Sequence, residues 1–136
     1  MNPQTTWELV AWMPRGYLAT ILIETAVLLA LLSPVHGWKR RVTAGVWLTA
    51  CTYPIVVVAI PTVMGMEPRW AYLAVAEVFA PVAECALFTL AFHTPTTERR
   101  VRFRDWTGVT VANLASFLTG EICAHTGWPK WLATGL

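Results

Sequence analysis

Residues 16–33 read GYLATILIETAVLLALLS, an unbroken apolar run in which Glu24 is the only charged side chain. An α-helix rises 1.5 Å per residue, so about 20 such residues cross a hydrocarbon core of about 30 Å. Similar runs follow at about 42–63, 70–92 and 106–123. We therefore predict an all-α fold in which residues 1–136 form one domain, an integral membrane bundle of four transmembrane helices.

The composition favours a membrane protein. Of the 136 residues, 56% are hydrophobic and 13% are charged, and the mean hydropathy is +0.51. Soluble domains carry about 25% charged residues, roughly twice the fraction found here. The apolar runs are also too long for the strands of a membrane barrel, which alternate over about 10 residues.

The basic residues predict the orientation. Those in loops 34–41 and 93–105 are Lys39, Arg40, Arg41, Arg99, Arg100, Arg102 and Arg104, whereas the opposite side has only Arg15, Arg69 and Lys130. The positive-inside rule places these two loops in the cytoplasm and both termini outside, in a membrane we expect to be the bacterial inner membrane. We expect the basic loops to set topology and contact lipid headgroups, and we expect no nucleic-acid partner.

Three acidic residues, Glu24, Glu77 and Glu84, lie within the predicted spans. An acidic residue at the centre of a spanning helix costs about 2.5–3.5 kcal/mol, and such residues nearly always face the bundle interior. Glu77 and Glu84 are seven residues apart, about two turns, so they share one helix face. We predict that these acids point inward at a functional site.

Polar partners for these acids occur on the other two spans. Thr49 and Thr52 share one face of the second span, as Asn113 and Ser116 do on the fourth. Gly120 continues the latter face and is expected to allow close helix packing. We predict a mid-depth cluster of Glu24, Thr52, Glu84 and Asn113.

No Lys or Arg lies in any predicted span, so these carboxyls either are protonated and hydrogen-bonded or bind a cation. The leading functional prediction is a small membrane subunit that handles a proton or cation within a homo-oligomer or a larger membrane complex. One alternative is a non-transporting accessory subunit that stabilises a larger assembly or binds lipid or pigment. Another is a membrane-embedded enzyme on a lipid-soluble substrate, with Glu77 or Glu84 as general acid or base.

Cofactor signals are weak. The spacing of Cys51, Cys85 and Cys123 does not suggest a zinc site, and we interpret all three as packing residues. His36 and His93 follow the first and third spans and would approach each other if the two helical hairpins are repeats, but we do not expect haem. Lipid is a possible ligand, and the sequence leaves a metal ion undetermined.

An internal repeat is suggested by an offset of 60 residues, which brings Glu24 onto Glu84 and Arg40 onto Arg100. The two hairpins would then cross in the same direction, with a symmetry axis along the membrane normal. Apolar hairpins also resemble one another by chance, so the sequence leaves open whether the bundle is two repeated hairpins.

The segments IETAVLLALL, LTACTYPIV, AEVFAPVAECAL and NLASFLTG together resemble a family of small bacterial four-helix membrane proteins with no known activity. That family has Glu-Thr-Pro on helix one, Asn-x-x-Thr-His-Pro on helix two, two Glu seven apart on helix three, and Asn-x-x-Ser with a following Gly on helix four. The resemblance implies a polar set of Glu24, Thr25, Thr52, Pro54, Glu77, Glu84, Asn113, Ser116 and Gly120. The chain departs from the pattern at Ala26, Thr49 and Tyr53, and the missing histidine at position 53 makes a metal site there less expected.

Overall fold

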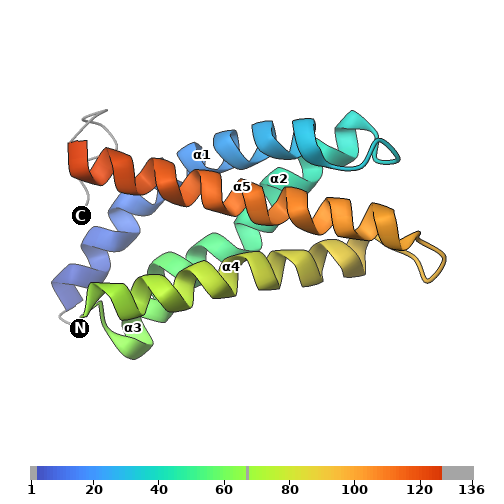
Figure 1. Cartoon of the computed structure of the whole chain (residues 1–136). Helices are drawn as coiled ribbons and strands as arrows, with labels where there is room; N and C mark the ends of the chain where they lie inside the picture. Colours follow the sequence, from blue (N-terminus) through green and yellow to red (C-terminus); the bar gives the residue numbers. More distant parts are fainter. Residues whose placement is uncertain (1–2, 67, 127–136) are drawn as a thin grey trace.

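The described part of the chain, residues 3–66 and 68–126 of a computed structural model, is helical and contains no strand. Four long helical segments run antiparallel to their neighbours in the chain (Figure 1). They are α1 (Pro3–Leu31), the continuous stretch α2 (Trp38–Pro54), η1 (Ile55–Ala59) and α3 (Ile60–Met64), then α4 (Arg69–Phe92) and α5 (Arg99–Thr126). The all-α prediction is confirmed for these residues.

Three helical segments of the described residues are long and apolar enough to cross a membrane: Met13–Leu31, Trp38–Met64 and Arg69–Phe92. They correspond to the first three predicted spans, although α1 ends at Leu31 and not at residue 33. The fourth predicted span, 106–123, lies within α5, which is longer than this span and less apolar than α1 and α4.

The loop predicted at 93–105 is shorter than expected. Residues 99–105 are already helical, because α5 begins at Arg99, so the basic run RRVRFR forms its first turns. The loop proper therefore lies between the end of α4 at Phe92 and Arg99. This basic end of α5 lies beside the loop between α1 and α2, opposite the start of α1 and the end of α5 (Figure 1).

Prolines explain the irregular turn in the second helical segment. The π-helical segment η1 lies between Pro54 and Pro61, and its bonding passes the N–H of Ile60 to the carbonyl of Ile55. Pro61 has no N–H, so the carbonyl of Val56 loses its helical donor. The Tyr72 hydroxyl on α4 donates to that carbonyl at 3.2 Å. A side chain thus supplies the hydrogen bond that proline removes.

Helices α1 and α2 approach each other closely at Gly45. A Cβ on Gly45 would lie 2.9 Å from the Thr25 Cα and closer still to its Oγ1, so only glycine fits. At Gly120, which was expected to allow close packing, a Cβ would meet no atom of the described residues within 4 Å. Gly120 instead lines a cavity inside the bundle.

A fully apolar layer fills the bundle between its middle and its basic end. Its buried side chains come from all four long helical segments and are Leu28, Leu32, Ala44, Leu48, Phe88, Val109 and Ala112. Residues three or four apart in a helix lie on one face. Most of these side chains therefore come in such pairs, and Phe88 is the single contribution of α4. The layer separates two polar clusters, one at mid-length and one near the loops.

Candidate functional site

Glu24 on α1 is 3% exposed and is held by residues from two other helices. The Thr49 hydroxyl on α2 lies 2.6 Å from Oε2, and the Ser116 hydroxyl on α5 lies 2.8 Å from Oε1. Both carboxyl oxygens therefore have a hydrogen-bonding partner, as burial of such a group requires.

Glu84 on α4 is 2% exposed and has the matching arrangement. The Thr52 hydroxyl on α2 lies 2.6 Å from Oε1, and the Asn113 side-chain amide on α5 donates to Oε2 at 2.7 Å. Helices α2 and α5 thus each contribute one contact to each acid. The structure brings six predicted site residues into one cluster: Glu24, Thr49, Thr52, Glu84, Asn113 and Ser116.

The other predicted site residues lie outside this hydrogen-bonded cluster. Thr25 faces Gly45, and its buried hydroxyl has no hydrogen-bond partner among the described residues. Glu77 is half-buried on α4 and makes no hydrogen bond or ion pair with another described residue. It does line the same cavity as the two buried acids.

The three hydroxyls of the cluster have two acceptors each. Besides the carboxyl oxygens, Thr49 lies 2.7 Å from the Gly45 carbonyl, and Thr52 lies 3.0 Å from that of Leu48. Ser116 is 2.9 Å from the Asn113 carbonyl in the same way. A hydroxyl carries one hydrogen, so it donates either to an ionised carboxylate or to its backbone carbonyl while accepting from a protonated carboxyl. Rotation of hydroxyl hydrogens alone therefore accommodates both protonation states.

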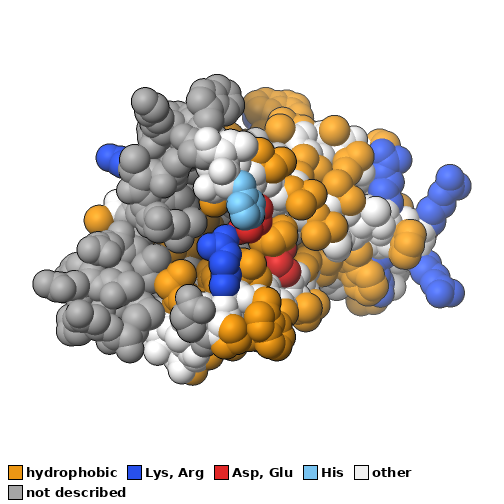
Figure 2. Space-filling view, turned by 60° about the vertical axis from the view of Figure 1, so that its left-hand side comes forward, with side chains coloured by type: hydrophobic (Ala, Val, Ile, Leu, Met, Phe, Trp, Pro, Cys, Tyr) orange, Lys and Arg blue, Asp and Glu red, His pale blue; other side chains and the backbone are white. Residues whose placement is uncertain are grey.

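A cavity of about 260 Å³ connects the acids to the end of the bundle that holds α3. Tyr53 also lines it, and its buried hydroxyl has no partner among the described residues. Near the cavity rim, Arg69 and Glu121 form an ion pair at 2.5 Å. Figure 2 shows acidic, basic and histidine side chains gathered on this face among hydrophobic ones.

The cavity stops at the apolar layer. Beyond Glu24 and Glu84 in the direction of the loops lie Leu28, Leu48 and Phe88, each at most 1% exposed. Such close-packed side chains leave no room for water. The described structure therefore gives the acids access from one end of the bundle and closes them from the other.

No protein-family model, curated protein or solved structure matches this chain. The interpretation of the site consequently depends on its geometry.

Sequence reasoning missed two important residues. Gly45 carried no signal beyond being a small residue in an apolar run. Asp105 is fully buried between His36 and His93, and its signal was an acid placed directly after the basic run of α5.

Proposed function

We propose that the chain is a small integral membrane protein with four transmembrane helices and both termini on the outer side. The fourth helix, α5, begins with the basic run RRVRFR, which lowers its mean hydropathy, and in its middle Asn113 and Ser116 point inward at the two acids. Its exposed side chains include an apolar stripe at helical spacing: Val111, Leu114, Leu118 and Ile122. Polar residues inside and apolar residues outside are the pattern expected of a helix that faces lipid.

The proposed role of the protein is to take up and release a proton, or to bind a small cation, at Glu24 and Glu84. The observation that carries this proposal is the pair of buried carboxyls, each held by one residue from α2 and one from α5, at the closed end of a cavity. Hydrogen bonds between membrane helices contribute only about 0.6 kcal/mol each on average. This is small beside the cost of inserting two acids, so structural stabilisation alone accounts poorly for them.

The same geometry supports action within an assembly. The apolar layer closes the cavity, so one chain in this conformation offers a binding site and not a continuous path. We propose that the protein works as a subunit of a homo-oligomer or of a larger membrane complex, with lipid as its surroundings. The seven basic residues at the opposite end favour a cytoplasmic position for the loops.

The test uses the purified chain reconstituted in lipid vesicles. Glu24→Gln combined with Glu84→Gln keeps the side-chain shape but removes the two fully buried carboxyls of the cluster and leaves Glu77 in place, and Glu121→Gln is a matched control at the cavity rim. Infrared difference spectra between acidic and alkaline buffer report the carboxyl band, and a pH-sensitive dye in the vesicles reports proton flux.

We expect the wild type and Glu121→Gln to show a buried carboxyl band that responds to pH or to added cation, and the double variant to lose the part of this band that comes from Glu24 and Glu84. Any proton or cation flux should disappear with that band. If the double variant keeps wild-type spectra and flux while its helix content is unchanged, the acids are structural and the accessory-subunit interpretation replaces this one.

A further inference from the structure

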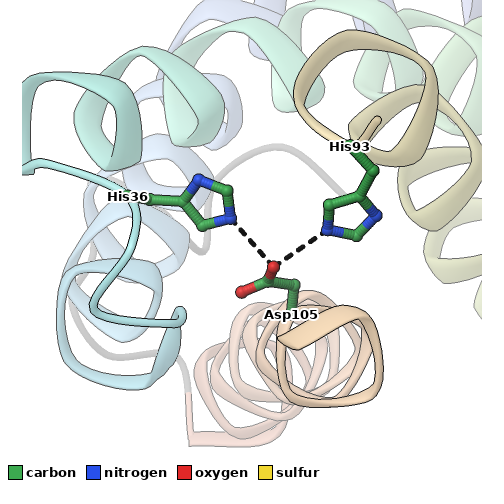
Figure 3. Close-up of side chains that lie close together, drawn as sticks. All are labelled: His36, His93 and Asp105. Carbon is green, nitrogen blue, oxygen red and sulfur yellow. Dashed lines mark hydrogen bonds and ion pairs between the residues drawn. The ribbon is translucent and has the colours of Figure 1, made fainter. Parts of the chain in front are cut away.

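A second polar cluster lies on the far side of the apolar layer and plays no part in the proposed function. His36 from the loop after α1 and His93 from the end of α4 both point at Asp105 on α5 (Figure 3). Each histidine Nε2 lies 2.9 Å from the same carboxylate oxygen, Oδ2. The three ligand-type atoms all lie within 4.8 Å of one another.

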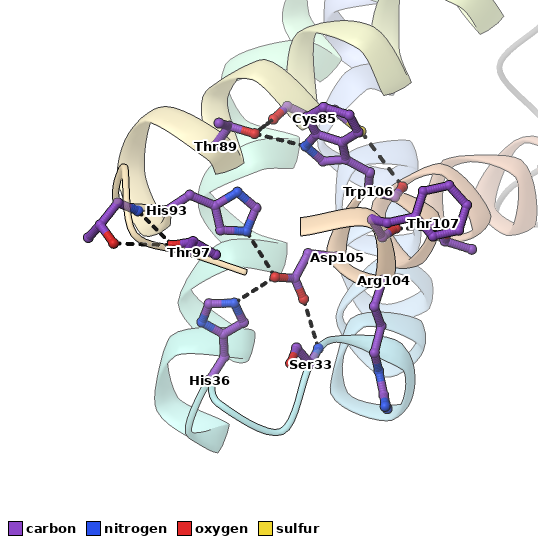
Figure 4. Close-up of polar contacts among 12 residues, drawn as sticks. Ser33, His36, Cys85, Thr89, His93, Thr97, Arg104, Asp105, Trp106 and Thr107 are labelled. Carbon is purple, nitrogen blue, oxygen red and sulfur yellow. Dashed lines mark hydrogen bonds and ion pairs between the residues drawn. The ribbon is translucent and has the colours of Figure 1, made fainter. Parts of the chain in front are cut away.

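The Asp105 carboxylate is unusual in its surroundings. It is 0% exposed, and its other oxygen accepts the backbone N–H of Ser33 at 2.8 Å (Figure 4). No Lys or Arg of the described residues forms an ion pair with it, although several lie at the same end of the bundle. A fully buried carboxylate must be hydrogen-bonded or paired with a positive charge, and these contacts fit either donation from the two Nε2–H groups or a cation bound between the three residues.

The far nitrogens of the two rings take no part in these contacts. The Nδ1 atoms of His36 and His93 are both buried without a hydrogen-bond partner among the described residues. Nδ1 stays unpaired whether Nε2 donates to Asp105 or binds a metal ion, so the case for a metal ion depends on the convergence of the three buried ligand atoms.

We infer that His36, His93 and Asp105 form a binding site for one divalent transition-metal ion of the zinc type. Zinc lies about 2.0–2.2 Å from nitrogen and oxygen ligands, which separates tetrahedral ligand atoms by about 3.3 Å. The two 2.9 Å contacts need to widen by a few tenths of an ångström to reach this spacing, and the two Nε2 atoms, which lie within 4.8 Å of each other, need to adopt it as well. The Ser33 N–H fixes the carboxylate orientation, as outer hydrogen bonds do for metal ligands.

The ligand set also sets the selectivity. Two imidazole nitrogens suit zinc, cobalt and nickel, whereas magnesium and calcium prefer oxygen ligands. The basic residues at this end repel cations that are held by charge alone, so affinity must come from the nitrogen donors. We therefore expect zinc and cobalt to bind in the presence of excess magnesium.

The experiment measures zinc per chain by mass spectrometry in the tag-free protein, stripped with chelator and then dialysed against Zn²⁺ with excess Mg²⁺. The ligand variants are His93→Gln and Asp105→Asn. His125→Gln is the matched control, since that histidine is 83% exposed, and Glu24→Gln with Glu84→Gln separates this site from the carboxyl cluster. X-ray absorption at the zinc edge of the wild type identifies its ligands even if a ligand variant fails to fold.

We expect one zinc per chain in the wild type and in both controls, a loss of affinity of about tenfold or more in the ligand variants, and an absorption spectrum with two imidazole ligands. A wild type without stoichiometric zinc would overturn the inference. So would zinc that persists in folded His93→Gln and Asp105→Asn, zinc lost only with the Glu24 and Glu84 change, or a spectrum without imidazole. Absent zinc, zinc that persists in the ligand variants, or a spectrum without imidazole would leave the proposed role of the carboxyl cluster unaffected, whereas zinc lost only with the Glu24 and Glu84 change would place the ion at that cluster.

Discussion

Replacing Gly45 with alanine should separate α1 from α2 and destabilise the bundle. The added Cβ would lie 2.9 Å from the Thr25 Cα and 3.0 Å from its Cβ. The Thr25 Cα is a backbone atom and cannot rotate away as the end of a flexible side chain would, so the two helices must move apart. Because Thr49 follows Gly45 by one turn, this movement should also stretch its hydrogen bond to Glu24.

The magnitude follows from a comparison with two other helical glycines. Gly120→Ala adds a Cβ that meets no described atom within 4 Å, and Gly108→Ala adds one at an ordinary 3.5 Å from Leu31. All three changes gain about 0.5–1 kcal/mol from higher helix propensity. Only Gly45→Ala also has the overpacking cost of about 1–3 kcal/mol. Both variants gain the same helix propensity, so this gain cancels when they are compared. The Gly45→Ala variant should therefore be less stable than the Gly120→Ala variant by about 1–3 kcal/mol.

The assay is equilibrium unfolding of the three variants in the same detergent micelles, followed by helical circular dichroism. The stability order should be Gly120→Ala and Gly108→Ala together, then wild type, then Gly45→Ala. If Gly45→Ala is as stable as Gly120→Ala, the close contact between α1 and α2 does not exist as described, and the position of Glu24 beside Thr49 loses its support.

Two further predictions concern the apolar layer and the cavity rim. Phe88→Ala removes a fully buried ring and should lower the free energy of unfolding by about 3–5 kcal/mol. The control in the same unfolding assay is Val82→Ala, on an exposed position of α4. Equal effects of the two changes would show that Phe88 is not in a packed core. Glu121→Gln breaks the ion pair with Arg69, whose side chain is 49% exposed, so it should change the free energy of unfolding by less than about 1 kcal/mol. A larger loss of stability, or a loss that added salt does not reduce, would show that this ion pair closes the cavity.

Hydrophobic patterning determined much of the fold. Uninterrupted apolar runs around Glu24 and Glu84 predicted the first and third spans, because backbone groups in lipid must be satisfied within a helix. The spacing of Thr49 with Thr52, and of Asn113 with Ser116, predicted which polar residues share a helix face. That information is local, and the hydrogen bonds to the two acids agree with it.

What the sequence by itself determined is therefore the helical class, the positions of the apolar helices and the inward polar faces, since these follow from the 3.6-residue period within one helix. Only the tertiary structure decided which faces meet. The rotation of α1 against α2 made Gly45 a contact glycine, whereas Gly120 on α5 lines the cavity. The meeting of two loops with the first turns of α5 placed His36, His93 and Asp105 together from positions up to 69 residues apart. Such contacts depend on how helices rotate and pack against one another, and no periodicity within a single helix encodes that.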